Sequence, residues 1–158
     1  MKHYRADTYR ARSSIGYLVK RTHSMMLSIM ETAFAEHGFT FMQWIVLIHA
    51  RDRMSLTASA ICREFGHDSG ALTRVIDQLV ARKLIERRRS KTDRRASELR
   101  LTAAGRKTVE TQIPLVVDKL NFALADFSRA EFAELTRLLV KLVDRLQQME
   151  PADGQAVQ

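Results

Sequence analysis

Residues 57–102 decide the fold of this chain, and they read TASAICREFG (57–66), HDSGALTRVIDQLVARK (67–83) and LIERRRSKTDRRASELRLT (84–102). The middle segment predicts a helix from about Ser69 to Lys83, because its apolar residues recur at the spacing of one buried helical face. These residues are Leu72, Val75, Ile76, Leu79 and Val80; the opposite face carries Gly70, Thr73, Arg74, Asp77, Gln78 and Ala81. A shorter helix is expected over Thr57–Phe65 with Ala60, Ile61 and Phe65 inward, and Gly66 as the left-handed residue that ends it. Two helices joined by so short a turn form the helix-turn-helix arrangement, in which the second helix reads DNA.

A basic ribbon follows this helix pair. Leu84–Ser90 and Ala96–Thr102 are predicted strands, and in the second one Ser97, Leu99 and Leu101 alternate with Glu98 and Arg100 as in a half-buried strand. Residues 82–100 hold nine Lys or Arg and three Asp or Glu, a local net charge of +6. A two-stranded ribbon with a basic tip has the shape of a wing, and arginines at that tip suit a narrow, strongly negative minor groove.

The ribbon carries a family resemblance. The run from Asp93 to Thr102 resembles the wing signature of the MarR (multiple antibiotic resistance regulator) family, a D-x-R motif, hydrophobic strand positions, Leu-Thr and a glycine three residues later, here Gly105. Residues 72–79 resemble the recognition helix of that family, and residues 84–87 resemble the strand that enters its wing. The resemblance covers nearly the whole chain apart from the tails. It implies a dimeric winged helix-turn-helix transcription regulator.

Composition agrees with this interpretation. The chain has 158 residues, 46% hydrophobic residues, two prolines and six glycines, which favours one mostly helical domain, with or without an extension. Its net charge of +8 suggests a polyanionic partner, either nucleic acid or an anionic membrane surface, and the concentration of charge on the predicted wing favours nucleic acid. The sequence has neither a long apolar run nor the apolar core of a signal peptide, which predicts a cytoplasmic protein with no membrane partner. Its single cysteine, Cys62, allows no intramolecular disulfide, which fits the same compartment.

Four further helices are expected outside the deciding stretch. The first begins at Ser13 or Ser14, runs to about Glu36 and ends before Gly38, and a capping box of Thr40 and Gln43 opens the next, which runs to about Arg51. The inward residues expected on these two helices are Ile15, Leu18, Val19, Thr22, Met26, Ile29, Met30 and Ala33, then Trp44, Ile45, Leu47 and Ile48. A third helix, about 103–127, contains Pro114, which predicts a kink or a break. The last, from Ser128 as its cap to about Met149, has an apolar stripe of Phe132, Leu135, Leu138, Leu139, Leu142, Val143 and Leu146.

The predicted fold is therefore mainly α with a small β-hairpin wing. We expect a single unit over residues 13–150, with a winged helix-turn-helix lobe at about 40–102 and dimerisation helices at about 13–36 and 103–149. Residues 1–12 and 151–158 are expected to be flexible tails. One copy would have difficulty covering all the terminal apolar stripes, so a two-fold homodimer is predicted. The alternative is that the terminal helices pack on their own domain.

Other chemistry finds little support in the sequence. The five histidines lack the spacing of metal sites, and the cluster of Cys62, Glu64 and His67 reads as ordinary helix-end residues. Some members of the family sense peroxide through a cysteine in the first helix, but Cys62 follows later in the chain and is predicted to be a small core residue. The sequence offers no phosphate loop, nucleophile elbow or acid/base pair. We therefore predict no enzyme activity, no cofactor and no metal.

The predicted site residues form two sets. The expected DNA contacts are Ser69, Gly70, Thr73, Arg74, Lys91, Arg94 and Arg95, with Asp93 bracing the turn of the wing. Of these, Arg74 is expected to read base edges and Arg94 to enter the minor groove of a palindromic operator in double-stranded DNA. Many members of the family bind phenolic or aromatic carboxylic compounds, and here Tyr17, Arg21, Trp44 and His49 lie on the elements that would line such a site. The alternatives are that Trp44 is simply core and Arg21 part of a solvated face.

Three functions are compatible with this sequence. The favoured one is a sequence-specific, dimeric regulator of transcription, a repressor of a nearby operon that a small aromatic or phenolic ligand releases. A non-specific architectural nucleic-acid-binding protein would explain the charge but not the dimeric ends. A winged-helix module for protein interaction would not need Arg94 and Arg95 at the tip.

Overall fold

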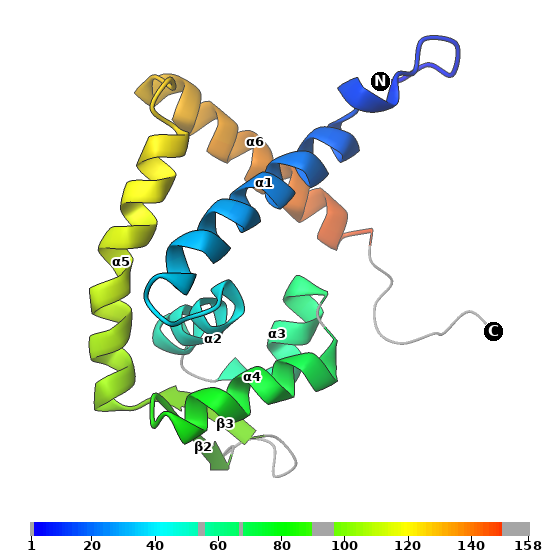
Figure 1. Ribbon diagram of the computed structural model, residues 1–158. Helices are drawn as coiled ribbons and strands as arrows, with labels where there is room; N and C mark the ends of the chain where they lie inside the picture. The colour runs from blue at the N-terminus through cyan, green and yellow to red at the C-terminus, as the bar shows by residue number, and fades with distance from the viewer. Residues whose placement is uncertain (1, 54–55, 67, 90–96, 150–158) are drawn as a thin grey trace, which may run out of the picture. The chain divides into compact units, whose positions relative to one another are not determined.

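The computed structural model describes residues 2–53, 56–66, 68–89 and 97–149, in two compact units, Met1–Lys119 and Leu120–Gln158. The first unit contains η1 (Ala11–Ser13), α1 (Ile15–Ala35), α2 (Phe41–Asp52), β1 (Leu56–Thr57), α3 (Ala58–Phe65), α4 (Ser69–Ala81), β2 (Ile85–Arg89), β3 (Ser97–Leu101) and most of α5 (Ala103–Ala123) (Figure 1). The second unit contains the end of α5 and α6 (Arg129–Gln147). The described chain is mostly helical with one small sheet, which confirms the predicted fold class.

The helix-turn-helix forms through local capping. The Thr57 hydroxyl accepts a hydrogen bond from the Ala60 amide at 3.2 Å at the start of α3, and Gly66 ends that helix with a φ of 64°, as predicted. Asp68 then caps α4, its Oδ1 accepting from the Ala71 amide at 2.8 Å. On the inward face of α4, Leu72, Ile76 and Leu79 are fully buried.

Phe65 departs from the prediction. It was expected to point inward, but 38% of its surface is exposed, and its ring meets the His49 ring edge-on at a centroid distance of 5.0 Å. Phe65 is the last residue of α3, so no further turn of that helix covers it. The buried residue of α3 is Ile61, as expected.

The sheet has three antiparallel strands in the order β1-β3-β2. The register pairs Leu56 with Leu99 and Ile85 with Leu101. Strand β1 was not predicted, because two residues are too few to show an alternating pattern. The predicted alternation along β3 is also wrong at Glu98, which is 5% exposed, whereas Ser97 is exposed. As β3 is the central strand, Glu98 is flanked by strands on both sides.

The core lies between the helices and the sheet of the first unit. Phe34 of α1 stacks on Trp44 of α2 at a centroid distance of 5.4 Å, and both rings are buried. Helix α2 contacts α1, α4 and β3, so its buried face is wider than predicted. Val46 is completely buried, whereas Ile45 and Ile48, expected inside, are only partly buried.

Helix α5 runs without a break through Pro114, so the predicted break is absent, and the helix ends at Ala123 rather than near residue 127. Val109 and Val116 pack against the core on either side of the proline. This packing offsets the backbone hydrogen bond that proline removes.

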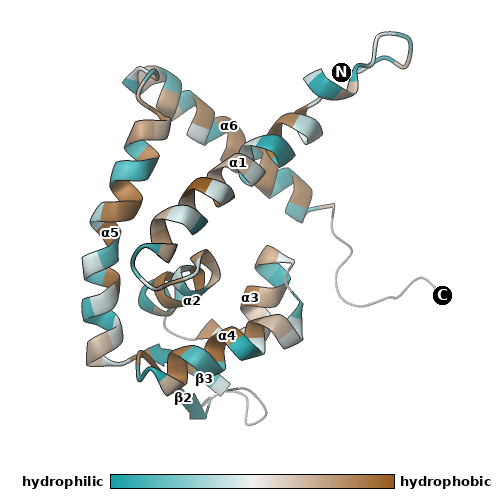
Figure 2. Cartoon of the chain, in the orientation of Figure 1, coloured by the Kyte–Doolittle hydropathy of each residue, from teal (hydrophilic) through white to brown (hydrophobic). Residues whose placement is uncertain are grey.

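The apolar stripes of α1 and α6 are exposed in the single chain. On α1 only Met30, Ala33 and Phe34 are buried, and the predicted inward residues Ile15, Leu18, Val19, Met26 and Ile29 are 38–51% exposed. Helix α6 has no buried residue, although Figure 2 shows apolar stretches along both helices. None of the described helices is long and apolar enough to cross a membrane.

The start of α5 is locked to the sheet. The Thr102 hydroxyl donates to the Lys83 carbonyl at 2.7 Å and accepts from the Gly105 amide at 3.0 Å. A Cβ atom built on Gly105 would lie 2.0 Å from the carbonyl oxygen of Leu84, so only glycine fits there without a backbone shift.

Gly105→Ala should therefore lower the free energy of unfolding by about 3 kcal/mol, since the clash is with backbone rather than with a flexible side chain. Gly16→Ala is the matched control, because no heavy atom lies within 4 Å of that position. Urea unfolding at one protein concentration measures the free energy of unfolding of both variants. Equal midpoints for the two variants would contradict the close approach.

Candidate nucleic-acid interface

The outward face of α4 begins with four exposed residues, Ser69, Gly70, Thr73 and Arg74. The Thr73 hydroxyl donates to the Ser69 carbonyl at 2.7 Å, which ties it to the first turn. Within the described part of the chain Arg74 has no hydrogen bond or ion pair, so its guanidinium can meet an external acceptor. The structure thus brings together the four predicted contacts of the recognition helix.

The N-terminus of α4 is compact. A Cβ on Gly70 would lie 3.2 Å from Asp68 Oδ1, so a larger residue there would crowd the capping carboxylate. Small residues also leave the first turn open to close approach by another surface. The positive end of the helix dipole adds to the attraction of a phosphate, although the Asp68 carboxylate offsets part of it.

Polar contacts fix α4 on its lobe. Gln43 donates through Nε2 to Gln78 Oε1 at 3.0 Å, and the Arg82 guanidinium donates to the Gly38 carbonyl at 3.1 Å. The same guanidinium lies 4.0 Å from the centroid of the Phe39 ring, in a cation–π contact. Arg82 had no predicted role, because its partners lie about forty residues earlier in the chain.

An ion pair joins α4 to the wing strand. Arg87 Nη2 of β2 lies 2.7 Å from Asp77 Oδ1, and both side chains are about half exposed. Asp77 was predicted only to lie on the face of the helix opposite its apolar residues. A pair so exposed adds little stability, but it links the recognition helix to β2.

The predicted wing-tip residues lie outside the described residues; these are Lys91, Asp93, Arg94 and Arg95. The described strands that lead to the tip are themselves basic. Arg88 Nε pairs with Glu86 at 2.7 Å, and Arg100 Nη2 pairs with Glu98 at 3.2 Å. Arg89 is exposed and has no hydrogen bond or ion pair within the described residues.

The four predicted ligand residues fall into separate surroundings. Arg21 donates to the Tyr17 hydroxyl at 3.4 Å on α1. Trp44 is 6% exposed and stacked in the core, which leaves little of its ring for a ligand. His49 Nδ1 lies 2.9 Å from the Ile45 carbonyl, and its Nε2 lies 3.8 Å from Glu64. No contact among the described residues joins the first pair to the second.

The described residues contain no group of three metal-ligating side chains that could hold a metal ion. Cys62 is half-buried and packs against the core, in keeping with a structural residue.

A helix-turn-helix whose second helix leads into an antiparallel wing, preceded and followed by long helices, defines a winged helix-turn-helix protein. Comparison of the sequence then gives the family. The profile of the MarR family matches residues 37–96. The chain belongs to the MarR family.

Known relatives support that assignment. The transcriptional repressor MprA of Escherichia coli is 30% identical over 111 residues, which are 70% of this chain and 63% of MprA. A mutant of E. coli MarR complexed with operator DNA is similar at a TM-score of 0.69 and 26% identity, over 81% of this chain and 92% of that one. BpsR of Bordetella bronchiseptica, whose structure addresses regulation of its DNA binding by 6-hydroxynicotinic acid, has a TM-score of 0.67 and 26% identity over 92% and 99% of the two chains.

Arg82→Ala should lower the free energy of unfolding by about 1 kcal/mol, because it removes a charged hydrogen bond and an exposed cation–π contact. Arg74→Ala is the control with the same change of side chain and no described contact to lose. Chemical denaturation of both variants gives the difference. If Arg82→Ala were as stable as Arg74→Ala, Arg82 would not hold α4.

Proposed function

We propose that this protein is a sequence-specific, dimeric DNA-binding regulator that represses a nearby operon. The observation that carries the proposal is the exposed guanidinium of Arg74, unpaired among the described residues, on the outward face of a capped recognition helix. The operator complex of the similar E. coli MarR and the repressor name of MprA support it. No step of this function needs catalysis by the chain, and we assign it none.

In the proposed complex the first half of α4 lies in the major groove. Arg74 reaches a base edge, where an arginine can make two parallel hydrogen bonds to guanine. Ser69, Gly70 and Thr73 approach the phosphates beside it. From the family resemblance we assign Arg94 to the minor groove and Asp93 and Arg95 to the turn, and Lys91 is proposed as a further DNA contact.

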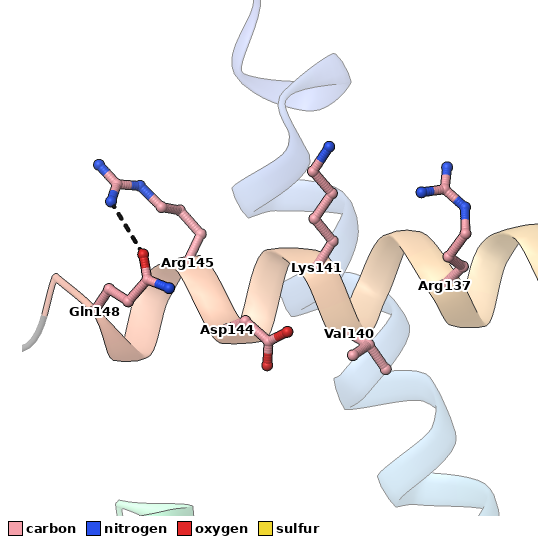
Figure 3. A pocket seen from close by; sticks show the side chains of 6 residues that line it. All are labelled: Arg137, Val140, Lys141, Asp144, Arg145 and Gln148. Carbon is pink, nitrogen blue, oxygen red and sulfur yellow. Dashed lines mark hydrogen bonds between the residues drawn. The ribbon is translucent and has the colours of Figure 1, made fainter.

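The proposed dimer covers the apolar stripes of α1 and α6. Figure 3 shows Arg137, Lys141 and Arg145 projecting from one side of α6, four residues apart, so that helix has a cationic face. Its exposed leucines, which include Leu138 and Leu139, lie outside that row. Burying each half-exposed leucine against a second copy would contribute about 1 kcal/mol. A two-fold dimer also presents two recognition helices to successive major grooves.

Leu138→Glu should shift the protein from dimer toward monomer at micromolar concentration, because a carboxylate would replace a buried leucine. Thr136→Glu introduces the same charge two residues away and should leave the dimer intact. Analytical ultracentrifugation measures both. A monomeric wild-type protein at that concentration would refute the dimer.

Arg74→Ala should weaken binding to the operator by about 1–3 kcal/mol and relax the preference at one base pair. Gel-shift titrations with the operator and with random duplex, at matched salt, measure this; the region upstream of the gene is the first operator to test. Arg94→Ala, tested alongside, should also weaken binding with the fold intact. Equal loss on every sequence would make Arg74 a phosphate contact, and wild-type protein that binds random duplex equally well would favour the architectural alternative.

A small aromatic acid or phenol is proposed to release the operator. BpsR, regulated by 6-hydroxynicotinic acid, supports this class of ligand. Such a ligand can weaken DNA binding only by as much as it prefers a conformation with wrongly spaced recognition helices, so a tenfold preference supplies about 1.4 kcal/mol. We expect at least one member of a panel of aromatic acids to raise the protein concentration needed for the gel shift. If no compound in the panel changes the protein concentration needed for the gel shift, the protein would be a DNA binder that no aromatic acid of the panel regulates.

A further inference from the structure

A second basic surface, with no lining residue from α4, forms a hollow of about 570 Å³. It lies where the end of α2, strands β2 and β3 and the start of α5 meet. The ten lining residues are Ala50, Arg51, Arg53, Glu86, Arg88, Arg100, Leu101, Thr102, Ala103 and Arg106. Five of them are arginines, and one is acidic.

Each of these arginines is held by a partner that leaves other donors open. Arg51 Nε bonds Asp52 at 2.6 Å, and that hydrogen bond lowers the pKa of the Asp52 carboxyl. Arg88 Nε bonds Glu86 at 2.7 Å, and Arg106 Nη1 donates to the Leu101 carbonyl at 3.0 Å. A guanidinium has five N–H donors, so one carboxylate or carbonyl does not exhaust it. A held arginine also loses less side-chain entropy when a ligand binds.

The acids that balance these cations sit mostly outside the hollow. Arg53 pairs with Glu64 and Arg100 with Glu98, and neither carboxylate lines the cavity. Only Glu86 does. With their partners counted, five arginines and four carboxylates carry a net charge of +1, and Arg106 is the arginine that bonds a carbonyl rather than a carboxylate among the described residues.

The N-terminus of α5 adds to this charge. Its first turn contains no acidic residue and instead carries Arg106, although the N-terminal end of a helix dipole disfavours a cation. The Thr102 hydroxyl caps only the Gly105 amide. A helix of 21 residues with a cation at its positive end, among four other arginines, is an arrangement that an anion would stabilise.

We propose that this hollow, formed by Arg51, Arg53, Arg88, Arg100 and Arg106, is a phosphate-binding site. Arginine suits the role, because its planar donors match phosphate oxygens in pairs. The phosphate comes either from the DNA backbone flanking the operator, since β2 and β3 also lead to the wing, or from a free phosphorylated molecule. The first source rests on the proposed function, and the second does not.

The free protein tests the site directly. Calorimetric titration with inorganic tripolyphosphate, in a buffer without phosphate, should show binding that Arg106→Gln and Arg88→Gln each weaken about tenfold, the loss expected for one charged hydrogen bond. Lys107→Gln is the matched control, with the same charge change one residue along α5 but outside the hollow. Two variants are used so that one remains if the other fails to fold, as checked by circular dichroism.

DNA of two lengths separates the sources. If the backbone supplies the phosphate, both variants should weaken binding to an operator with long flanks, with little effect on the bare operator. The slope of log affinity against log salt should then fall by about 0.9 for each phosphate lost. If a free molecule supplies it, the variants should bind both duplexes like wild type but lose tripolyphosphate.

Failure of the proposal is distinct from failure of the proposed function. The phosphate site would be overturned if Arg106→Gln and Arg88→Gln bound both tripolyphosphate and the long-flank operator as tightly as Lys107→Gln does. A wild-type protein that binds no operator would instead refute the regulator, and the tripolyphosphate titration would still decide about the hollow.

Discussion

The lobe depends on the close approach of two backbone segments at Gly105. The Leu84 carbonyl, where the chain enters the wing, lies where a side chain on Gly105 would begin. The Thr102 hydroxyl stabilises the same junction, because it donates a hydrogen bond to the Lys83 carbonyl and accepts one from the Gly105 amide. Entry into the wing, exit from it and the start of α5 are thus fixed to one another. A shift of any one of them displaces the strands that lead to the basic tip.

The recognition helix is positioned by two kinds of contact that act differently. Burial of Leu72, Ile76 and Leu79 supplies stabilisation, but apolar packing tolerates small rotations of a helix. Hydrogen bonds and ion pairs have directional geometry. The Gln43–Gln78 bond therefore restricts the rotation of α4, and hence the direction of Arg74, in addition to the core, whereas the exposed Asp77–Arg87 pair adds little.

Much of this lobe could be predicted from the sequence, because its determinants are local. The capping box of Thr40 and Gln43, the left-handed Gly66 and the period of α4 each lie within a few neighbouring residues. What the sequence could not predict depends on distant partners. Arg82 meets a carbonyl 44 residues earlier, and the buried Glu98 lies on a strand whose partner β1 places Thr57 opposite it.

The terminal helices also show that a sequence pattern does not identify distant partners. The pattern correctly identified the apolar stripes of α1 and α6 but not what covers them, because periodicity records only that a face avoids water. In the single chain these stripes are exposed. The pattern placed Trp44 inward, which its burial and its stacking on Phe34 confirm, whereas its candidate ligand role came only from the family resemblance.

Helix α5 gives a physical route by which the proposed ligand could act on the wing. Its 21 residues, about 30 Å of helix, start at the Gly105 junction and continue into the second unit, so one element belongs to both. A helix transmits a displacement at one end to the other, except where it bends. Pro114 lies near its middle, where the missing backbone hydrogen bond concentrates bending. If a second copy holds the far end, a ligand that bent α5 at Pro114 would change the position of the sheet, and with it the spacing of two recognition helices.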